Sequence, residues 1–101
     1  MAKIIVRNSD NRVVYCLEDS QIITMTSDEC KFTHTYDDRN TIVLDINSST
    51  HTVYEDVTAP TSFYGNCFTY IDGNWALLDD AVTKLNEGRT LVGLPTISPK
   101  L

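Results

Sequence analysis

The stretch FTYIDGNWALLDD, residues 68–80, alternates aromatic and other side chains around an Asp-Gly pair. Asp-Gly favours the tight turn of a β-hairpin, because both central positions of that turn take a positive φ angle. A loop of two residues and one of four give the same register, with Tyr70 opposite Trp75 and Phe68 opposite Leu77. We therefore predict a hairpin with one apolar, mostly aromatic face.

A second hairpin is predicted near the N-terminal end, where KIIVR and RVVYCLE flank the turn NSDN. Its register places Val6 opposite Val13. One face then carries Ile4, Val6, Val13 and Tyr15, and the other carries Ile5, Val14 and Cys16. Because both faces are apolar, we expect other parts of the chain to cover both of them.

The middle of the chain contains further runs typical of strands, QIITMT, CKFTHTY, TIVLDI and THTVYEDV, separated by polar turns. The stretch TAPTSFYGN interrupts this pattern and is expected to form a longer loop. The helical candidate is DDAVTKLNEG, with Asp79 or Asp80 at its N-cap and Gly88 at its end.

The sequence therefore predicts a mainly β fold, either a small antiparallel β-sandwich or an open barrel, with one short C-terminal helix and an extended C-terminal tail. The length of 101 residues fits one domain. We expect a single β-rich domain at residues 1–90 and an extended segment at 91–101, where Pro95 and Pro99 oppose regular structure.

Composition and charge exclude several classes of partner. The chain has 8 basic and 14 acidic residues and a net charge of −6, and its basic residues are dispersed, which argues against nucleic-acid binding. No stretch approaches the about 18 apolar residues of a membrane helix, so no membrane insertion is expected. The apolar run at residues 4–6 is too short for a signal peptide, which favours a protein made in the cytoplasm.

The widely spaced Cys16, Cys30 and Cys67 suggest buried free thiols.

Two groups of residues raise the question of catalysis or metal binding. His34 and His51 could hold a metal together with Asp45 or Glu55 if their strands were neighbours. Cys30 or Cys67 could act as a nucleophile with His34, although no flanking base is evident.

Local structure explains the two acidic pairs of the chain. Asp37 and Asp38 fall in a turn, and Asp79 and Asp80 fall at a helix start, where negative charge is favourable. The chain has no P-loop and no GxSxG or GxGxxG motif. We therefore expect no enzymatic activity, no catalytic or metal-binding residues and no cofactor.

The candidate functional residues are instead apolar and aromatic side chains suited to binding. Exposed aromatic residues near loops can act as binding hot spots or stack on sugars. An apolar C-terminal segment can pack on a neighbouring subunit. The candidates are Phe63, Tyr64, Trp75, Leu91, Val92, Leu94, Ile97 and Leu101.

The combination of Gly65-Asn66, Phe68-Thr69-Tyr70, Asp72-Gly73 and Trp75 resembles a pattern in small tailed-bacteriophage proteins that are virion structural or tail-fibre-associated. The resemblance covers about 15 residues and brings no catalytic residues with it. It implies a structural protein of the virion that associates with copies of itself or with a larger virion protein. A tail or fibre location is the first expectation, and a capsid decoration protein is the alternative. A small module that binds glycans of the host surface is the alternative from a different class.

Overall fold

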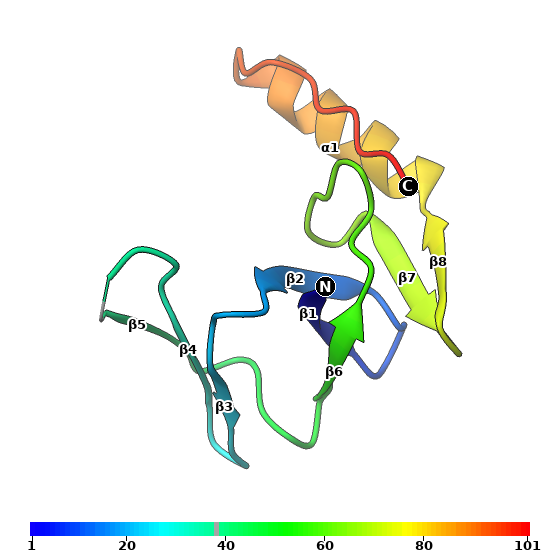
Figure 1. Ribbon diagram of the computed structural model, residues 1–101. Helices are drawn as coiled ribbons and strands as arrows, with labels where there is room; N and C mark the ends of the chain where they lie inside the picture. The colour runs from blue at the N-terminus through cyan, green and yellow to red at the C-terminus, as the bar shows by residue number, and fades with distance from the viewer. Residues whose placement is uncertain (38) are drawn as a thin grey trace.

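Strand β1 (Ala2–Arg7) lies at the centre of the fold in a computed structural model that describes residues 1–37 and 39–101 (Figure 1). It pairs antiparallel with β2 (Val13–Glu18) on one side and β6 (His51–Val57) on the other. Ile4, Ile5 and Val6 are at most 2% exposed, so both faces of β1 are covered, as its two apolar faces predict.

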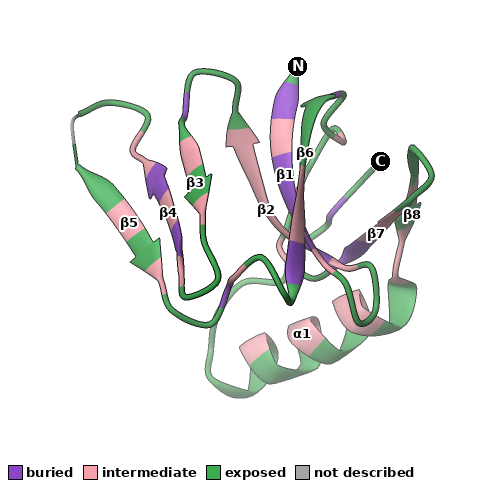
Figure 2. Ribbon diagram, turned by 90° about the horizontal axis from the view of Figure 1, so that it is seen from below, coloured by how far each residue is buried: buried purple, intermediate pink, exposed green. Residues whose placement is uncertain are grey.

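A second antiparallel sheet covers one face of this central sheet. It is formed by β3 (Ile23–Met25), β4 (Cys30–Thr33) and β5 (Asn40–Val43), in that order. Ile5 of the central sheet packs with Cys30 and Phe32 of β4 and with Ile46, and half-buried apolar side chains surround this cluster. Figure 2 shows buried residues, in purple, on both β1 and β4, which belong to different sheets.

The hairpin of β7 (Phe68–Ile71) and β8 (Asn74–Leu77) covers the opposite face of the central sheet. The cluster of Ile4, Val6, Val13 and Val57 packs there against Phe63, Tyr70 and Trp75. The chain is thus mainly β, with three small antiparallel sheets and one C-terminal helix, and the predicted fold class is confirmed.

The register predicted for the hairpin of β7 and β8 is confirmed. Tyr70 pairs with Trp75 and Phe68 pairs with Leu77. The loop has two residues, Asp72 with φ 50° and Gly73 with φ 82°, and two positive φ angles are the signature of the type I′ turn that Asp-Gly favours.

The faces predicted for the hairpin of β1 and β2 are wrong beyond Val14. Val6 does pair with Val13, but Ile5 pairs with Tyr15, because the register shifts by one residue at this point. Such a bulge moves every later side chain of the strand to the other face. Tyr15 therefore packs with Ile5, and Cys16 packs in the cluster of Ile4.

The helix α1 (Asp79–Leu91) is longer than the sequence predicts. Its N-cap is Leu78, which makes no side-chain cap, so the expected caps are wrong and both acids lie in the first turn. The helix continues through Gly88 and ends before Gly93, which has a φ of 79°. The N–H of Leu94 donates to the carbonyl of Arg89 at 2.8 Å, as in a Schellman motif.

The predicted strand at residues 30–36 is also shorter than expected, since β4 ends at Thr33. Tyr36 is consequently 94% exposed. Asp37 accepts hydrogen bonds from the backbone N–H and the side chain of Arg39, which agrees with a turn role for that acid. Its predicted partner Asp38 lies outside the described residues.

Candidate interaction surface

Three segments pack together at one end of the molecule: α1, the loop of residues 58–67 between β6 and β7, and the C-terminal segment of residues 92–101 (Figure 1). We call this region the helix–loop face. Six of the eight candidate residues named from the sequence lie in the two non-helical segments, Leu91 lies in α1, and Trp75 lies in β8 beneath them.

The C-terminal segment folds back on its own helix. Asn86 exchanges two hydrogen bonds with the backbone of Ile97, at 2.7 and 3.0 Å. Arg89 donates to the carbonyl of Pro95 at 2.6 Å, and the backbones of Ser62 and Lys100 form a bridge. The segment lacks regular structure, as predicted, but the folded chain itself holds it in place.

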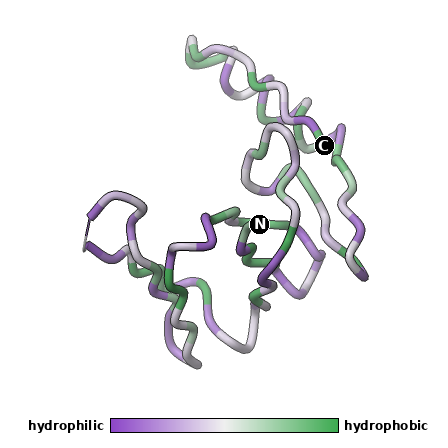
Figure 3. Tube along the Cα trace, viewed as in Figure 1, coloured by the Kyte–Doolittle hydropathy of each residue, from purple (hydrophilic) through white to green (hydrophobic). Residues whose placement is uncertain are grey.

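This folding divides the apolar candidates between two places. Leu91, Val92 and Leu94 are 87%, 71% and 50% exposed and follow one another at the C-terminal end of α1. Figure 3 shows how hydrophobic and hydrophilic residues are distributed along the trace. Leu101 is 57% exposed and lies toward the other end of α1 (Figure 1). Ile97, between them, is half-buried against the helix.

The aromatic candidates are also separated. Phe63 and Trp75 are half-buried and pack around Phe68, with ring centroids 5.8 and 5.7 Å from it. Tyr64 is 37% exposed, and its hydroxyl lies 3.5 Å from a guanidinium nitrogen of Arg89. Of these three side chains, only Tyr64 is exposed enough to offer a ring to a ligand.

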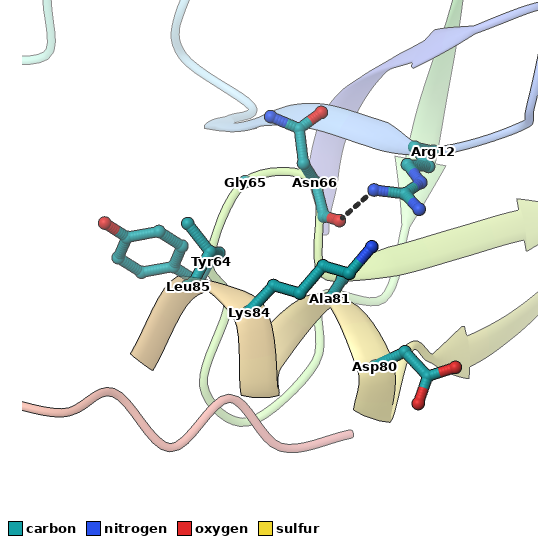
Figure 4. Close-up of a pocket in the computed structure, with 8 residues that line it drawn as sticks. All are labelled: Arg12, Tyr64, Gly65, Asn66, Asp80, Ala81, Lys84 and Leu85. Carbon is teal, nitrogen blue, oxygen red and sulfur yellow. Dashed lines mark hydrogen bonds between the residues drawn. The ribbon is translucent and has the colours of Figure 1, made fainter. Parts of the chain in front are cut away.

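The helix–loop face contains a groove of about 520 Å³ between residues 64–66 and the first turns of α1 (Figure 4). A volume of this size lies within the roughly 300–1,000 Å³ of typical small-ligand sites. The groove is lined by Arg12, Tyr64, Gly65, Asn66, Asp80, Ala81, Lys84 and Leu85.

Contacts between distant parts of the chain assemble this groove. The backbone N–H of Asn66 donates to the carbonyl of Val13 at 2.9 Å, which holds the loop on β2. Arg12 forms an isolated β-bridge with Thr69, which places it beside β7. The N–H of Leu78 donates to the carbonyl of Cys67 at 2.8 Å, which fixes the start of the helix next to the same loop.

Sequence reasoning missed Arg12 and Lys84 as groove residues and counted them only among dispersed basic residues. They stand 72 positions apart, 84 against 12, and no local motif links them. The bridge of Arg12 with Thr69 joins two hairpins that are distant in the chain, so no local signal could have found Arg12.

The two histidines considered for metal binding come from segments of different sheets, although His51 and Asp45 line one cavity. β4 and β6 belong to different sheets, so the strands near His34 and His51 are not neighbours. His34 contacts the Thr41 hydroxyl at 2.9 Å, and His51 contacts the Thr50 hydroxyl at 2.7 Å. Among residues 1–37 and 39–101, no group of three His, Cys, Asp or Glu residues could hold a metal ion.

The cysteines have the properties of structural thiols. Cys30 and Cys67 are fully buried, and Cys16 is half-buried. Burial raises the pKa of all three thiols, which disfavours the nucleophilic thiolate. The prediction of buried free thiols is confirmed for Cys30 and Cys67.

Comparisons of this chain with protein-family models, with curated proteins and with solved structures find no match. In the described part of the chain, α1 is too short and too polar to cross a membrane.

Proposed function

We propose that this protein acts by binding, as a structural component of a tailed-bacteriophage virion, with the tail or its fibre region as the first location. It would be made in the host cytoplasm and would associate with copies of itself or with a larger virion protein. The resemblance of the hairpin around Asp72-Gly73 supports the virion, and the exposed apolar side chains support the binding role.

The observation that carries the proposal is the exposed apolar end of the helix–loop face. Leu91, Val92 and Leu94 lie within four consecutive residues, 91–94, and each side chain is at least half exposed. Contiguous exposed apolar surface on a small protein marks a contact with another protein. Burying one leucine side chain in such a contact is favourable by about 1.5–3 kcal/mol.

The first test asks whether the protein is part of the particle. Antibody labelling of purified virions, viewed by electron microscopy, is expected to mark the tail. Labelling of the whole shell would favour a decoration protein, for which hundreds of copies per particle are expected. Absence of the protein from purified particles would overturn the proposal.

The second test asks whether the apolar end of the helix makes the contact. The double change Leu91→Asp and Leu94→Asp is expected to reduce association, measured by sedimentation velocity and by incorporation into particles. Ile22→Asp is a single-substitution control, since Ile22 is 64% exposed and lies just before β3, outside the helix–loop face. Equal association of both variants would contradict the assigned surface.

Deletion of residues 91–101 is a weaker test, although the sequence suggests it. The deletion would also remove the bonds of Asn86 with Ile97 and of Ser62 with Lys100. A loss of assembly could then reflect a disturbed helix. The point substitutions avoid this ambiguity, because neither replaced side chain makes those bonds.

A further inference from the structure

We propose that the groove between residues 64–66 and α1 binds an acidic peptide segment of a partner protein, with Arg12 and Lys84 holding one of its carboxylates. The inference goes beyond the proposed assembly role, because a peptide could occupy the groove whether or not copies of the chain associate. It rests on the placement of two cations in one groove and on the apolar lining beside them.

Arg12 keeps hydrogen-bonding capacity for a ligand. Its Nη1 lies 3.5 Å from the carbonyl oxygen of Asn66, and its Nε lies 3.5 Å from a carboxylate oxygen of Asp10. Both distances exceed the 2.7–3.2 Å of a normal N–H···O bond. Arg7 holds the same Asp10 much more closely, at 2.6 and 3.1 Å. A carboxylate in the groove could therefore accept shorter, paired bonds from Arg12.

Lys84 supplies the second positive charge. In Figure 4 its ammonium end points toward the guanidinium of Arg12 along the same groove. Among the described residues, Lys84 forms no salt bridge. Two like charges that converge on one groove attract an anion into the space that they share.

Asp80, the acidic residue of the lining, forms no salt bridge with Lys84. It stands four positions before Lys84 on α1, a spacing that allows an ion pair on a helix surface. Figure 4 shows its carboxylate directed away from Lys84, and the two form no salt bridge. The nearby acid that pairs with the groove is instead Asp10, which lies 3.5 Å from Arg12 but is held more closely by Arg7.

The remaining lining favours a peptide over a nucleic acid. The ring of Tyr64 and the side chains of Ala81 and Leu85 give the groove an apolar part next to its two cations. An acidic peptide with a neighbouring aliphatic side chain would fill both parts. A nucleic acid would bring many phosphates toward a protein of net charge −6, which would repel them.

The test is an NMR titration of the isolated ¹⁵N-labelled protein with the blocked peptide acetyl-Leu-Glu-Glu-Leu-amide. The matched probe is acetyl-Leu-Gln-Gln-Leu-amide, which has nearly the same shape without the carboxylates. We expect the acidic peptide to shift the amide signals of Gly65, Asn66, Ala81 and Lys84, and to bind at least about tenfold more tightly than the neutral peptide.

Three variants separate the groove from general charge effects. Arg12→Gln and Lys84→Gln are each expected to weaken binding about tenfold, because each removes a charge-assisted contact. Lys31→Gln removes the same charge from the sheet of β3, β4 and β5 and is expected to change affinity less than about twofold. The exposed Lys84 can be replaced without loss of packing, so this variant remains informative even if Arg12→Gln fails to fold.

The inference would be overturned by equal binding of both peptides, by shifts that map outside the groove, or by equal losses in Lys31→Gln and Lys84→Gln. It would also be overturned by no binding at about 10 mM peptide, which lies beyond the weak end of recognisable affinity. Inorganic phosphate is titrated in parallel, and binding as tight as that of the acidic peptide would also overturn the peptide assignment. The titration requires neither a virion nor self-association, so its failure would leave the assembly proposal standing.

Discussion

Asn86 holds the backbone of Ile97 through two hydrogen bonds: its Oδ1 accepts from the N–H at 2.7 Å, and its Nδ2 donates to the carbonyl at 3.0 Å. A side-chain amide that bonds both the N–H and the carbonyl of one residue satisfies that backbone as a neighbouring strand would. The contact explains how residues 92–101 stay in place without regular structure.

Asn86→Ala is expected to release this segment from the helix. The change removes two hydrogen bonds, each contributing about 0.5–1.5 kcal/mol. We expect faster amide hydrogen exchange at residues 96–98, 100 and 101 and little change in the central sheet, since the loss is local. Glu87→Ala is the control, because Glu87 is exposed on the same helix. Unchanged exchange in Asn86→Ala would contradict the role of this contact.

Trp75→Ala is expected to be among the most destabilising changes in the hairpin. The indole packs edge-on against Phe68 at 5.7 Å and Tyr70 at 5.4 Å, and it covers one apolar cluster. Since Trp75 is half-buried, we expect a loss of roughly 2–4 kcal/mol in the free energy of unfolding, measured by urea denaturation. Ile71→Ala, in the same hairpin and 48% exposed, should cost less than about 1 kcal/mol.

Two glycine substitutions are expected to act in opposite directions. A Cβ at Gly65 would lie 3.0 Å from the backbone oxygen of Val14, so Gly65→Ala should destabilise the fold by about 1–3 kcal/mol. A Cβ at Gly88 meets nothing within 4 Å, and Gly88→Ala should stabilise α1 by up to about 1 kcal/mol. Thermal unfolding followed by circular dichroism measures both. A stable Gly65→Ala protein would show that the loop does not need this close approach.

His51 is expected to make stability fall in mildly acidic solution. Burial lowers the pKa of this imidazole below 6.5, the positive charge of Arg7 lowers it further, and Asp10 opposes the shift. The unfolded chain therefore binds a proton more readily than the folded one. The contribution of neutral His51 to the free energy of unfolding is fully present above the pKa of the unfolded state. It declines as the pH falls through about 6.5 toward the pKa of the folded state.

The free energy of unfolding at pH 7.5, 6.5 and 5.5 checks this sign. His51→Gln should flatten the decline. Asp37→Asn should leave it unchanged, because hydrogen bonds from Arg39 lower the pKa of the Asp37 carboxyl, which titrates below this range. An equal decline in the His51→Gln protein would assign the pH dependence to other groups.

The parts of the fold that were predictable depend on contacts between near neighbours in the chain. Asp72-Gly73 sets a type I′ turn, and the turn sets the pairing of Tyr70 with Trp75. Both follow from a few adjacent residues. Burial of both faces of β1 was predictable for a similar reason, since Ile4, Ile5 and Val6 leave no polar face.

The errors arise where distant segments decide the outcome. The bulge at Val14 changes the face of Tyr15, and it lies where the backbone of Asn66 bonds to β2. Gly88 looked like a helix end because glycine often is one, but the positive φ angle belongs to Gly93. The groove depends on Arg12 and on the first turns of α1, which only the folded chain brings together.

The central position of β1 has a kinetic consequence. Its partner β2 follows across one turn, whereas β6 begins only after residues 8–50, so pairing with β6 requires a large loop to close. Until then, the isoleucine-rich β1 has a bare edge, and bare apolar edges pair with other molecules. We expect recovery of native protein after dilution from urea to fall as protein concentration rises. The most buried strand of the native protein would be the most aggregation-prone one while the chain folds.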